Sequence, residues 1–264
     1  MNDLEHILKK PPFRNAQGVW LLTEHIPVQT HEAAYLKVRE KEGRILQDEE
    51  VKQLPSLSEK HPNYREWQLR KQTVDRFISF LKQESKPLRI LDVGCGNGWF
   101  TAKMTSLAPT KAVGLDLNLP ELEQAQRLFG NSVTSFCYGD IFEDVFEKES
   151  FDKVVLSASI QYFPSLTALF STLFPLLKPN GEIHILDSPF YKADELQPAK
   201  ERTAAYYQSM GCSEMTAFYY HHTLEELAEF SPVITSLSYS IRHLLLRKPK
   251  SPFPWIMLKK KQAS

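Results

Sequence analysis

Three glycines at alternate positions form the part of the chain whose residue types and spacing point most clearly to chemistry. Residues 90–93 read Ile-Leu-Asp-Val, and Gly94, Gly96 and Gly98 follow with one residue between neighbours. The whole chain of 264 residues contains only 10 glycines, so this cluster indicates a backbone that needs positive φ or must approach a ligand closely. We therefore expect a ligand-binding turn between a strand and a helix.

The spacing of these glycines differs from that of a dinucleotide-binding turn. The dinucleotide pattern GxGxxG would place its third glycine where Trp99 stands. This chain instead has GxGxG, with Asp92 two residues before the first glycine. The pattern therefore disfavours a nicotinamide-dependent dehydrogenase.

Apolar runs and helical patterns alternate from residue 88 onward, which predicts the elements that position this turn. Strands are expected at 88–93, 112–115, 132–138, 153–157 and 181–187, and strand-like segments at 233–246 and 255–259. Helices are expected at 99–107, 119–129, 166–177, 193–210 and 224–230. Such alternation predicts βαβ units and a parallel sheet. Ligands bind beyond the carboxyl ends of the strands in sheets of this kind.

The first 86 residues are more polar and lack this rhythm. They contain an apolar stretch at 19–22, expected helices at 31–42 and 64–82, and a linker between Pro55 and Pro62. We therefore divide the chain into an N-terminal extension, residues 1–62, which is a possible cover for an acceptor site, and a main domain, residues 63–264.

The segment Asp92-Val93-Gly94-Cys95-Gly96-Asn97-Gly98 resembles the first motif of the class I S-adenosylmethionine-dependent methyltransferases. Four further segments resemble the later motifs of that family in the expected order: 113–117, 138–141, 151–157 and 176–182. Five motifs in order over residues 88–188 identify the chain as a member of this family, of the small-molecule type with a methyltransferase-11-like core. The resemblance implies an α/β fold with a Rossmann-like, doubly wound, mostly parallel seven-stranded sheet, a last antiparallel strand and a mostly helical N-terminal extension.

The resemblance also implies S-adenosyl-L-methionine as the cofactor and assigns roles to acidic and apolar residues. Asp116 would accept hydrogen bonds from the ribose hydroxyls, and Asp140 from the adenine amino group. Leu117 and Ile141 would enclose the adenine, although each is also compatible with ordinary core packing. Asp92 would lie near the methionine end of the cofactor. The full predicted cofactor-binding set is Asp92, Gly94, Cys95, Gly96, Asn97, Gly98, Asp116, Leu117, Asp140, Ile141 and Ser157.

Methyl transfer is an in-line displacement from an activated sulfur, so the protein must mainly align the reactants. A general base is needed only where the acceptor must lose a proton. Tyr162 and His221 are the catalytic candidates. Tyr162 follows the fourth strand and either faces the acceptor or packs in the core. His221 or the neighbouring His222 is either a base or a half-exposed residue packed on the sheet.

The acceptor pocket is expected to come from segments outside the strand–helix core, and an aromatic cover is the pattern they suggest. Its candidate lining residues are Tyr64, Arg65, Trp67, Asp187, Phe190, Tyr191, Tyr206, Tyr207, Tyr219, Tyr220, His221 and His222. These residues are typical of a pocket for a small apolar or planar molecule.

Several function classes are disfavoured by what the sequence lacks. Residues 157–164 read Ser-Ala-Ser-Ile-Gln-Tyr-Phe-Pro, without the Asn/Asp-Pro-Pro-aromatic motif of methyltransferases that act on DNA bases or glutamine. A Pro-Cys nucleophile of the cytosine-C5 type is also absent. The 32 basic and 32 acidic residues balance, which makes a nucleic-acid partner unlikely.

Cys95, Cys137 and Cys212 are widely spaced, so neither a disulfide framework nor a metal site is expected. No apolar run approaches the roughly 20 residues of a membrane span, and the N-terminus lacks the apolar stretch of a signal peptide. A cytoplasmic location is the expectation. We thus expect a methyltransferase that acts on a small molecule. The alternatives are a non-catalytic cofactor-binding partner subunit or regulator and, less favoured, a nucleic-acid or protein methyltransferase.

Overall fold

A nine-stranded sheet forms the centre of the computed structural model, which describes residues 4–23, 30–107, 109–235 and 251–260. Its strands are β1 (Phe13–Arg14), β2 (Trp20–Leu21), β3 (Leu88–Val93), β4 (Thr110–Asp116), β5 (Thr134–Tyr138), β6 (Phe151–Ser157), β7 (Leu177–Leu186), β8 (Val233–Thr235) and β9 (Trp255–Lys259). The α-helices are α1 (Thr30–Lys41), α2 (Asp48–Gln53), α3 (Tyr64–Leu81), α4 (Trp99–Thr105), α5 (Leu119–Phe129), α6 (Leu166–Leu176) and α7 (Ala193–Ser209). Short 3-10 turns are η1 (Glu5–Ile7), η2 (Ile141–Glu143), η3 (Ile160–Tyr162), η4 (Ser213–Phe218) and η5 (Glu225–Phe230).

The strand order is β1-β2-β5-β4-β3-β6-β7-β9-β8. Neighbouring strands from β5 to β7 pair in parallel, whereas β9 runs antiparallel to both β7 and β8. The expected Rossmann-like unit of seven strands with a last antiparallel strand is therefore confirmed as β3 to β9.

The N-terminal extension adds two strands that the sequence did not predict. Strand β2 pairs in parallel with β5, where Trp20 lies opposite Cys137, and β1 pairs antiparallel with β2. Each strand has only two residues, too few for an alternating pattern to appear in the sequence. Helix α2 was also missed, because its six residues are mostly charged and bury only Val51.

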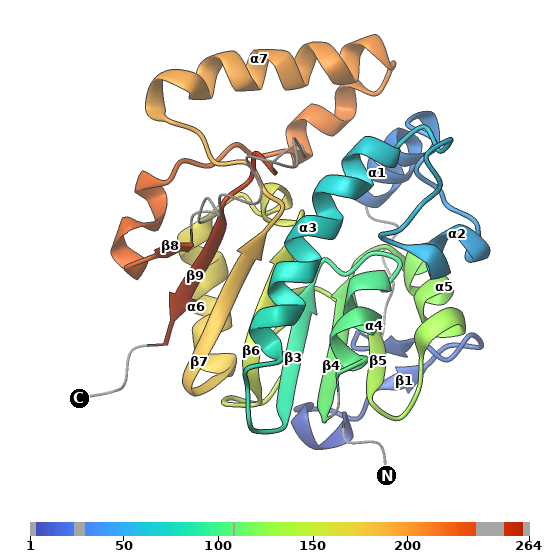
Figure 1. The fold of residues 1–264 in the computed structure, drawn as a ribbon, viewed down its shortest axis with the longest axis vertical. Coiled ribbons are helices and arrows are strands. Elements are labelled where there is room, and N and C mark those ends of the chain that lie inside the picture. The colour runs from blue at the N-terminus through green and yellow to red at the C-terminus, as the bar shows by residue number, and fades with distance from the viewer. Residues whose placement is uncertain (1–3, 24–29, 108, 236–250, 261–264) are drawn as a thin grey trace.

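Helices cover both faces of the sheet, with α3 and α4 on one face and α6 on the other (Figure 1). Successive residues of β3 pack against different layers. Ile90 belongs to the cluster that contains Phe77 of α3 and Phe100 of α4. Leu91 belongs to the cluster that contains Phe170 of α6. This two-residue alternation explains why the central strands are apolar along almost their whole length.

Helix boundaries follow local capping signals that the sequence contains. The Asn118 side chain accepts a hydrogen bond from the Glu121 backbone N–H at the start of α5, and Ser165 does the same for Ala168 at α6. Gly43 follows α1 with φ of +62°, a conformation that suits glycine at a helix end. Of the expected strand at 233–246, residues 233–235 form β8, and the remainder lies outside the described residues.

Helices α1 and α7 lie beyond the carboxyl ends of the strands, toward which the arrows of the parallel strands point in Figure 1. The glycine-rich turn after β3 and the loops after β4, β5, β6 and β7 end at the same edge of the sheet. This edge is therefore where the loops of the core meet the extension and the chain segment after β7.

Candidate functional site

The glycine-rich turn after β3 adopts the backbone conformation that its sequence suggested. Gly94, Gly96 and Gly98 have φ values of +76°, +53° and +71°. The Gly94 backbone N–H donates to the Leu115 carbonyl oxygen at 2.8 Å, which ties the turn to the end of β4. The turn is thus held on the sheet by its own backbone.

The three glycines serve different purposes. Gly94 and Gly96 line cavities at the sheet edge, whereas Gly98 is not among the residues that line them. A Cβ atom at Gly98 would lie 2.4 Å from Cε1 of Phe136 and 2.7 Å from Cβ of Ala125. Gly98 therefore allows α4 to pack closely against β5 and α5, and its predicted contact with the cofactor stays a prediction.

Asp116 at the end of β4 braces the turn. Its Oδ2 accepts a hydrogen bond from the Gly96 N–H at 2.7 Å, and its Oδ1 accepts one from the Asn118 N–H at 2.8 Å. The carboxylate also lines a cavity of about 440 Å³. It therefore combines a fixed orientation with access to a ligand.

This smaller cavity gathers the predicted residues from the ends of β4 and β5. Asp116, Leu117, Asp140 and Ile141 all line it. Oδ1 of Asp140 accepts a hydrogen bond from the Phe142 N–H at 3.0 Å, which leaves its second oxygen for another donor. Two acidic residues and two aliphatic side chains thus surround one space.

Asp92 lies beneath the turn rather than in the lining of this cavity. Its side chain is buried, and its Oδ2 accepts a hydrogen bond from the Thr101 hydroxyl at 2.6 Å. Burial, with a contribution from the nearby Asp116, raises the pKa of Asp92 to about 7 against the opposing effect of the Thr101 hydrogen bond. The predicted contact of Asp92 with the cofactor's methionine end stays a prediction.

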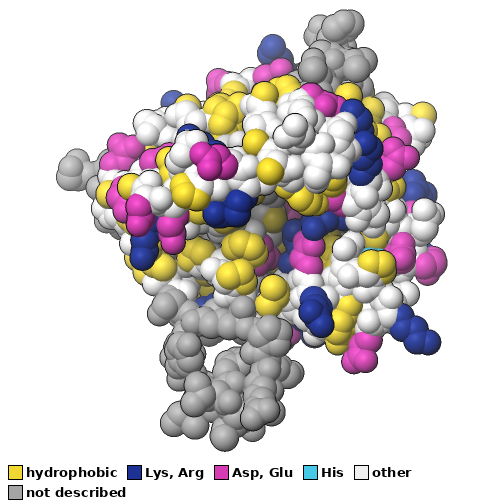
Figure 2. Space-filling model, turned by 90° about the horizontal axis from the view of Figure 1, so that it is seen from above, with side chains coloured by type: hydrophobic (Ala, Val, Ile, Leu, Met, Phe, Trp, Pro, Cys, Tyr) yellow, Lys and Arg dark blue, Asp and Glu magenta, His cyan; other side chains and the backbone are white. Residues whose placement is uncertain are grey.

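A larger cavity of about 790 Å³ adjoins the same turn and contains Cys95, Asn97 and Ser157 from the predicted set in its lining. Figure 2 shows the hollow on the face above the strand ends, with basic and acidic side chains inside it. The Cys95 thiol points toward the sheet, because a Cβ at Gly114 would lie 2.7 Å from its sulfur. This agrees with the interpretation that Cys95 contributes its backbone more than its thiol.

Five tyrosines line the larger cavity, and each ring contacts the next to form a continuous row. Ring centroids are 5.6 Å apart for Tyr35 and Tyr162, 6.2 Å for Tyr162 and Tyr219, 6.1 Å for Tyr219 and Tyr207, and 5.6 Å for Tyr207 and Tyr206. They come from α1, η3, α7 and the segment after η4. We call these five residues the tyrosine wall, and it matches the expected aromatic cover.

Ion pairs occupy the side of the larger cavity formed by α1 and α3. Arg44 binds the two oxygens of Glu66 at 3.1 and 2.7 Å, and its Nε lies 3.0 Å from Glu42. Arg70 donates to the same Glu66 at 3.1 Å. Arg39 lies 3.4 Å from Glu121. These charges therefore largely neutralise one another within the wall of the cavity.

The two cavities meet at a small set of shared residues. Tyr35, Gly94, Gly96, Ala158, Tyr162 and Met215 line both of them. We call this set the junction. Burial raises the pKa of the Tyr162 phenol above its usual value, so this side chain remains protonated near neutral pH and is suited to donate a hydrogen bond rather than to act as a base.

The prediction that His221 is a catalytic base is not supported by its position. Its Nε2 lies 2.8 Å from the Thr203 hydroxyl, its ring packs on Tyr191 and Tyr219, and it is not in the lining of either cavity. His222 is buried between the Phe163 carbonyl and Glu226. Both histidines therefore support the segment after η4, which contributes Tyr219 to the tyrosine wall.

The structure brings together about half of the candidate acceptor-site residues. Arg65, Trp67, Asp187, Tyr206, Tyr207 and Tyr219 line the larger cavity, and Tyr220 lines the smaller one. Tyr64, Phe190, Tyr191, His221 and His222 are absent from the lining of both. Tyr35, Arg39 and Glu42 of the extension also line the larger cavity and were not predicted, although their spacing of four and three residues would place them on one face of the expected helix at 31–42.

Neither a metal cluster nor a membrane span is found in the described ranges. They hold no group of three or more His, Cys, Asp or Glu side chains arranged to bind a metal ion. Among the described helices none is long and apolar enough to cross a membrane.

Comparison with known proteins identifies the family. The profile of a family described as "Methyltransferase domain" matches residues 84–231, which is more than half of the chain. The chain belongs to this methyltransferase-domain family. S-adenosylmethionine is its cofactor, as the motifs implied.

Curated relatives of this methyltransferase match it over part of their length. Sterol 24-C-methyltransferase of Debaryomyces hansenii is 30% identical over 111 residues, which are 40% of this chain and 29% of that protein. Malonyl-[acyl-carrier protein] O-methyltransferase of Halalkalibacterium halodurans is 34% identical over 103 residues, which are 37% of this chain and 38% of that protein. The chain thus spans about a third of the length of these relatives.

A solved structure supports the fold assignment. Geranyl diphosphate methyltransferase in complex with S-adenosylmethionine superposes with a TM-score of 0.55 at 14% sequence identity. The match covers 78% of this chain and 93% of that protein. At this identity the likeness concerns the fold alone.

Proposed function

We propose that this methyltransferase transfers a methyl group from S-adenosylmethionine to a small molecule bound in the larger cavity. The observation that carries the proposal is the junction, where a cavity lined by the cofactor motifs opens into a second cavity lined by the tyrosine wall. Two reactants held in adjoining cavities can meet with their reacting atoms aligned.

The residues of the smaller cavity fit the chemical groups of the cofactor. Asp116 would accept hydrogen bonds from the ribose diol, and the free oxygen of Asp140 would accept one from the adenine amino group. Leu117 and Ile141 would pack on the adenine ring. Gly94 and Gly96 line both cavities and have no side chain, so their backbone can approach the ligand.

The methionine end would extend past the glycine-rich turn, where Cys95, Asn97 and Ser157 line the larger cavity. When bound, S-adenosylmethionine supplies an electrophilic methyl group on a sulfonium. Tyr162 and Tyr35 would exclude water at the junction and orient the acceptor. Their role is alignment for an in-line displacement, because the leaving sulfur needs no protonation.

A small acceptor is favoured by the volume of the larger cavity, about 790 Å³, and by the names of the relatives, which describe methylation of a sterol and of a malonyl group on a carrier protein. Residues 1–62 would act as a cover over the catalytic domain, residues 63–264. Helix α1 of this extension contributes Tyr35 and Arg39 to the cavity lining, and Glu42 directly after it also lines the cavity.

Incubation with methyl-labelled S-adenosylmethionine and a low-molecular-mass metabolite extract tests the proposal. We expect label in a small product with wild-type protein and none with Asp116→Ala. The exposed Asp144→Ala variant is the matched control and is expected to retain activity. Label that appears only in protein or nucleic acid, or equal labelling by the Asp116→Ala variant, would contradict the proposal.

A further inference from the structure

Asp187 is an unusual residue at the carboxyl end of β7. It has φ of +50°, although it is not glycine, and it is only 7% exposed. Its Oδ1 accepts a hydrogen bond from the Thr73 hydroxyl of α3 at 2.7 Å. Its Oδ2 is buried and has no hydrogen-bond partner among the residues that the structure describes.

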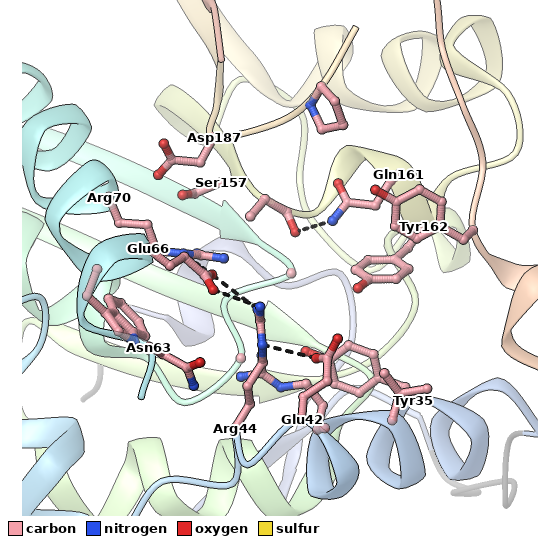
Figure 3. Close-up of a pocket in the computed structure, with 18 of the residues that line it drawn as sticks. Tyr35, Glu42, Arg44, Asn63, Glu66, Arg70, Ser157, Gln161, Tyr162 and Asp187 are labelled. Carbon is pink, nitrogen blue, oxygen red and sulfur yellow. Dashed lines mark hydrogen bonds and ion pairs between the residues drawn. The ribbon is translucent and has the colours of Figure 1, made fainter. Parts of the chain in front are cut away.

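A second buried acceptor lies in the same lining. Gln161, at 8% exposure, donates from Nε2 to the Ala158 carbonyl oxygen at 2.7 Å. Its Oε1 is buried, again with no partner in the described ranges. Figure 3 shows Asp187, Ser157 and Gln161 along one side of the larger cavity and Glu42 and Arg44 along the opposite side.

The basic side chains of the cavity do not satisfy these two oxygens. The charge of Arg70 acts on Asp187, but the Arg70 side chain donates its hydrogen bond to Glu66. Arg44 is also engaged by Glu42 and Glu66. Arg65 and Arg202 are exposed at their positions in the lining.

A buried acceptor without a hydrogen bond lowers the free energy of unfolding by about 1–3 kcal/mol, and a buried carboxylate lowers it by more. A donor supplied by a ligand would remove this cost, whereas a carboxylate or phosphate at the same place would add a second acceptor. We propose that Asp187 and Gln161 bind the nitrogen of an amine acceptor, with Asp187 as its counter-ion and proton acceptor. This inference rests on the proposed function and names the substrate class of the same site.

The transfer step balances with the groups present. Asp187 first takes one proton from the ammonium form of the acceptor and so frees the nitrogen lone pair. The bond between that nitrogen and the methyl carbon forms as the carbon–sulfur bond breaks, and the electron pair of the broken bond stays on sulfur. The product is a methylated ammonium and a neutral thioether. The proton on Asp187 leaves to solvent when the product departs.

The tyrosine wall indicates what carries the amine. Its five rings present flat apolar surface and, on their faces, negative electrostatic potential that attracts cations. A planar aromatic body with an amine on a short arm would stack on the wall and reach Asp187. Arylalkylamines are therefore the probes of choice.

Three matched pairs of compounds test the inference: tyramine, phenethylamine and tryptamine, each against the 3-arylpropanoate in which a carboxylate replaces the amino group. Two readouts are taken, namely label transfer from methyl-labelled S-adenosylmethionine, and the rise in melting temperature caused by each compound in the presence of S-adenosylhomocysteine. We expect at least one amine to be labelled and to raise the melting temperature, and its propanoate partner to do neither.

Variants separate the role of Asp187 from general damage to the fold. Asp187→Asn keeps the shape and loses the charge, and we expect at least a 100-fold loss of amine methylation with unchanged S-adenosylhomocysteine affinity. Gln161→Met is expected to weaken amine binding about tenfold. Asp75→Asn, which changes an exposed residue of α3 that pairs with Lys71, is the matched control and should behave as wild type.

Two sets of results would overturn the inference. The first is labelling of the propanoates alone, or of none of the amines, by a protein that binds S-adenosylhomocysteine, and this result leaves the proposed function standing. The second is amine methylation by Asp187→Asn at the wild-type rate. A wild-type protein that does not bind S-adenosylhomocysteine would instead refute the proposed function and the inference with it.

Discussion

The two cavities at the strand ends differ in how they are built. The smaller cavity is formed mainly by loops that directly follow β3, β4 and β5, and its acids are held by backbone hydrogen bonds of the core. The larger cavity is walled chiefly by α1, α3, α7 and η4, which lie in the chain before β3 or after β7. The core therefore holds the residues that we propose to bind the cofactor, and the periphery forms the wall of the proposed acceptor cavity.

The smaller and the larger cavity therefore depend on different physical constraints. A turn with positive φ and an acid at a strand end are local requirements, so short motifs record them. A wall assembled from helices far apart in the chain depends on tertiary packing, which has no short sequence pattern. The predictions below test each side of this contrast.

The largest effect is expected from the glycine that belongs to packing rather than to binding. Gly98→Ala would force Cβ against Phe136 at a positive φ, so we expect a loss of about 3 to 4 kcal/mol in the free energy of unfolding. Gly43→Ala is the matched control, because nothing lies within 4 Å of its added Cβ. Its cost is expected to be about 1 kcal/mol. Equal losses in urea unfolding would contradict the assignment of Gly98.

Asp116→Ala tests the cofactor cavity itself. The variant removes the predicted ribose acceptor together with the brace of the Gly96 and Asn118 N–H groups. We expect the dissociation constant for S-adenosylhomocysteine to rise about 100-fold, since a charged hydrogen-bonding group is worth about 1.5–3 kcal/mol. Isothermal titration calorimetry measures the change, with Asp144→Ala as control. An unchanged affinity in the Asp116 variant would remove Asp116 from the binding site.

Asp92→Asn should stabilise the ligand-free protein in a pH-dependent way. The folded pKa of about 7 lies above the usual value of 3.8, so the folded state holds the proton more tightly than the unfolded state. The resulting penalty is absent below about pH 4, grows as the pH rises, and is complete above about pH 7. We expect the variant to gain about 2 kcal/mol at pH 8 and nothing at pH 4.

Denaturant unfolding at the two pH values measures this gain, with Asp75→Asn as the exposed control. A gain that is the same at pH 4 and pH 8 would show that the charge of Asp92 is not its cause. The same variant should bind S-adenosylhomocysteine more weakly if Asp92 contacts the cofactor.

The smallest effect separates the two residues predicted to be catalytic. Tyr162 lines the junction, so Tyr162→Phe should lower the rate of label transfer about tenfold through the loss of one hydrogen bond. His221 is engaged with Thr203 outside both linings, so His221→Gln should change the rate less than twofold. A larger loss in the His221 variant, with its melting temperature unchanged, would reverse the order of importance.

The features that the sequence predicted follow the same division between the core and the peripheral segments. The parallel strands, the turn after β3 and the cavity positions of Asp116, Leu117, Asp140 and Ile141 were accessible from the sequence because each depends on neighbours along the chain. The role of Gly98 was not, because it depends on Phe136 and Ala125 across the sheet layer.

The strands of the extension illustrate the limit most clearly. β2 exists because Trp20 and Leu21 pair with β5, the outermost of the parallel core strands, and a two-residue segment carries no sequence pattern that predicts such pairing. Tyr35 at the junction could be placed only once α1 was known to lie over the strand ends. In contrast, the sequence itself shows that tyrosines are frequent after residue 200. It does not show which of them contact one another.

The most direct test of the account is a crystal structure of the protein with S-adenosylhomocysteine. We expect the ribose hydroxyls to donate hydrogen bonds to Asp116 and the adenine to lie between Leu117 and Ile141. We expect the sulfur to lie at the junction and to face the tyrosine wall. A ribose placed away from Asp116, or a sulfur turned away from the larger cavity, would contradict it.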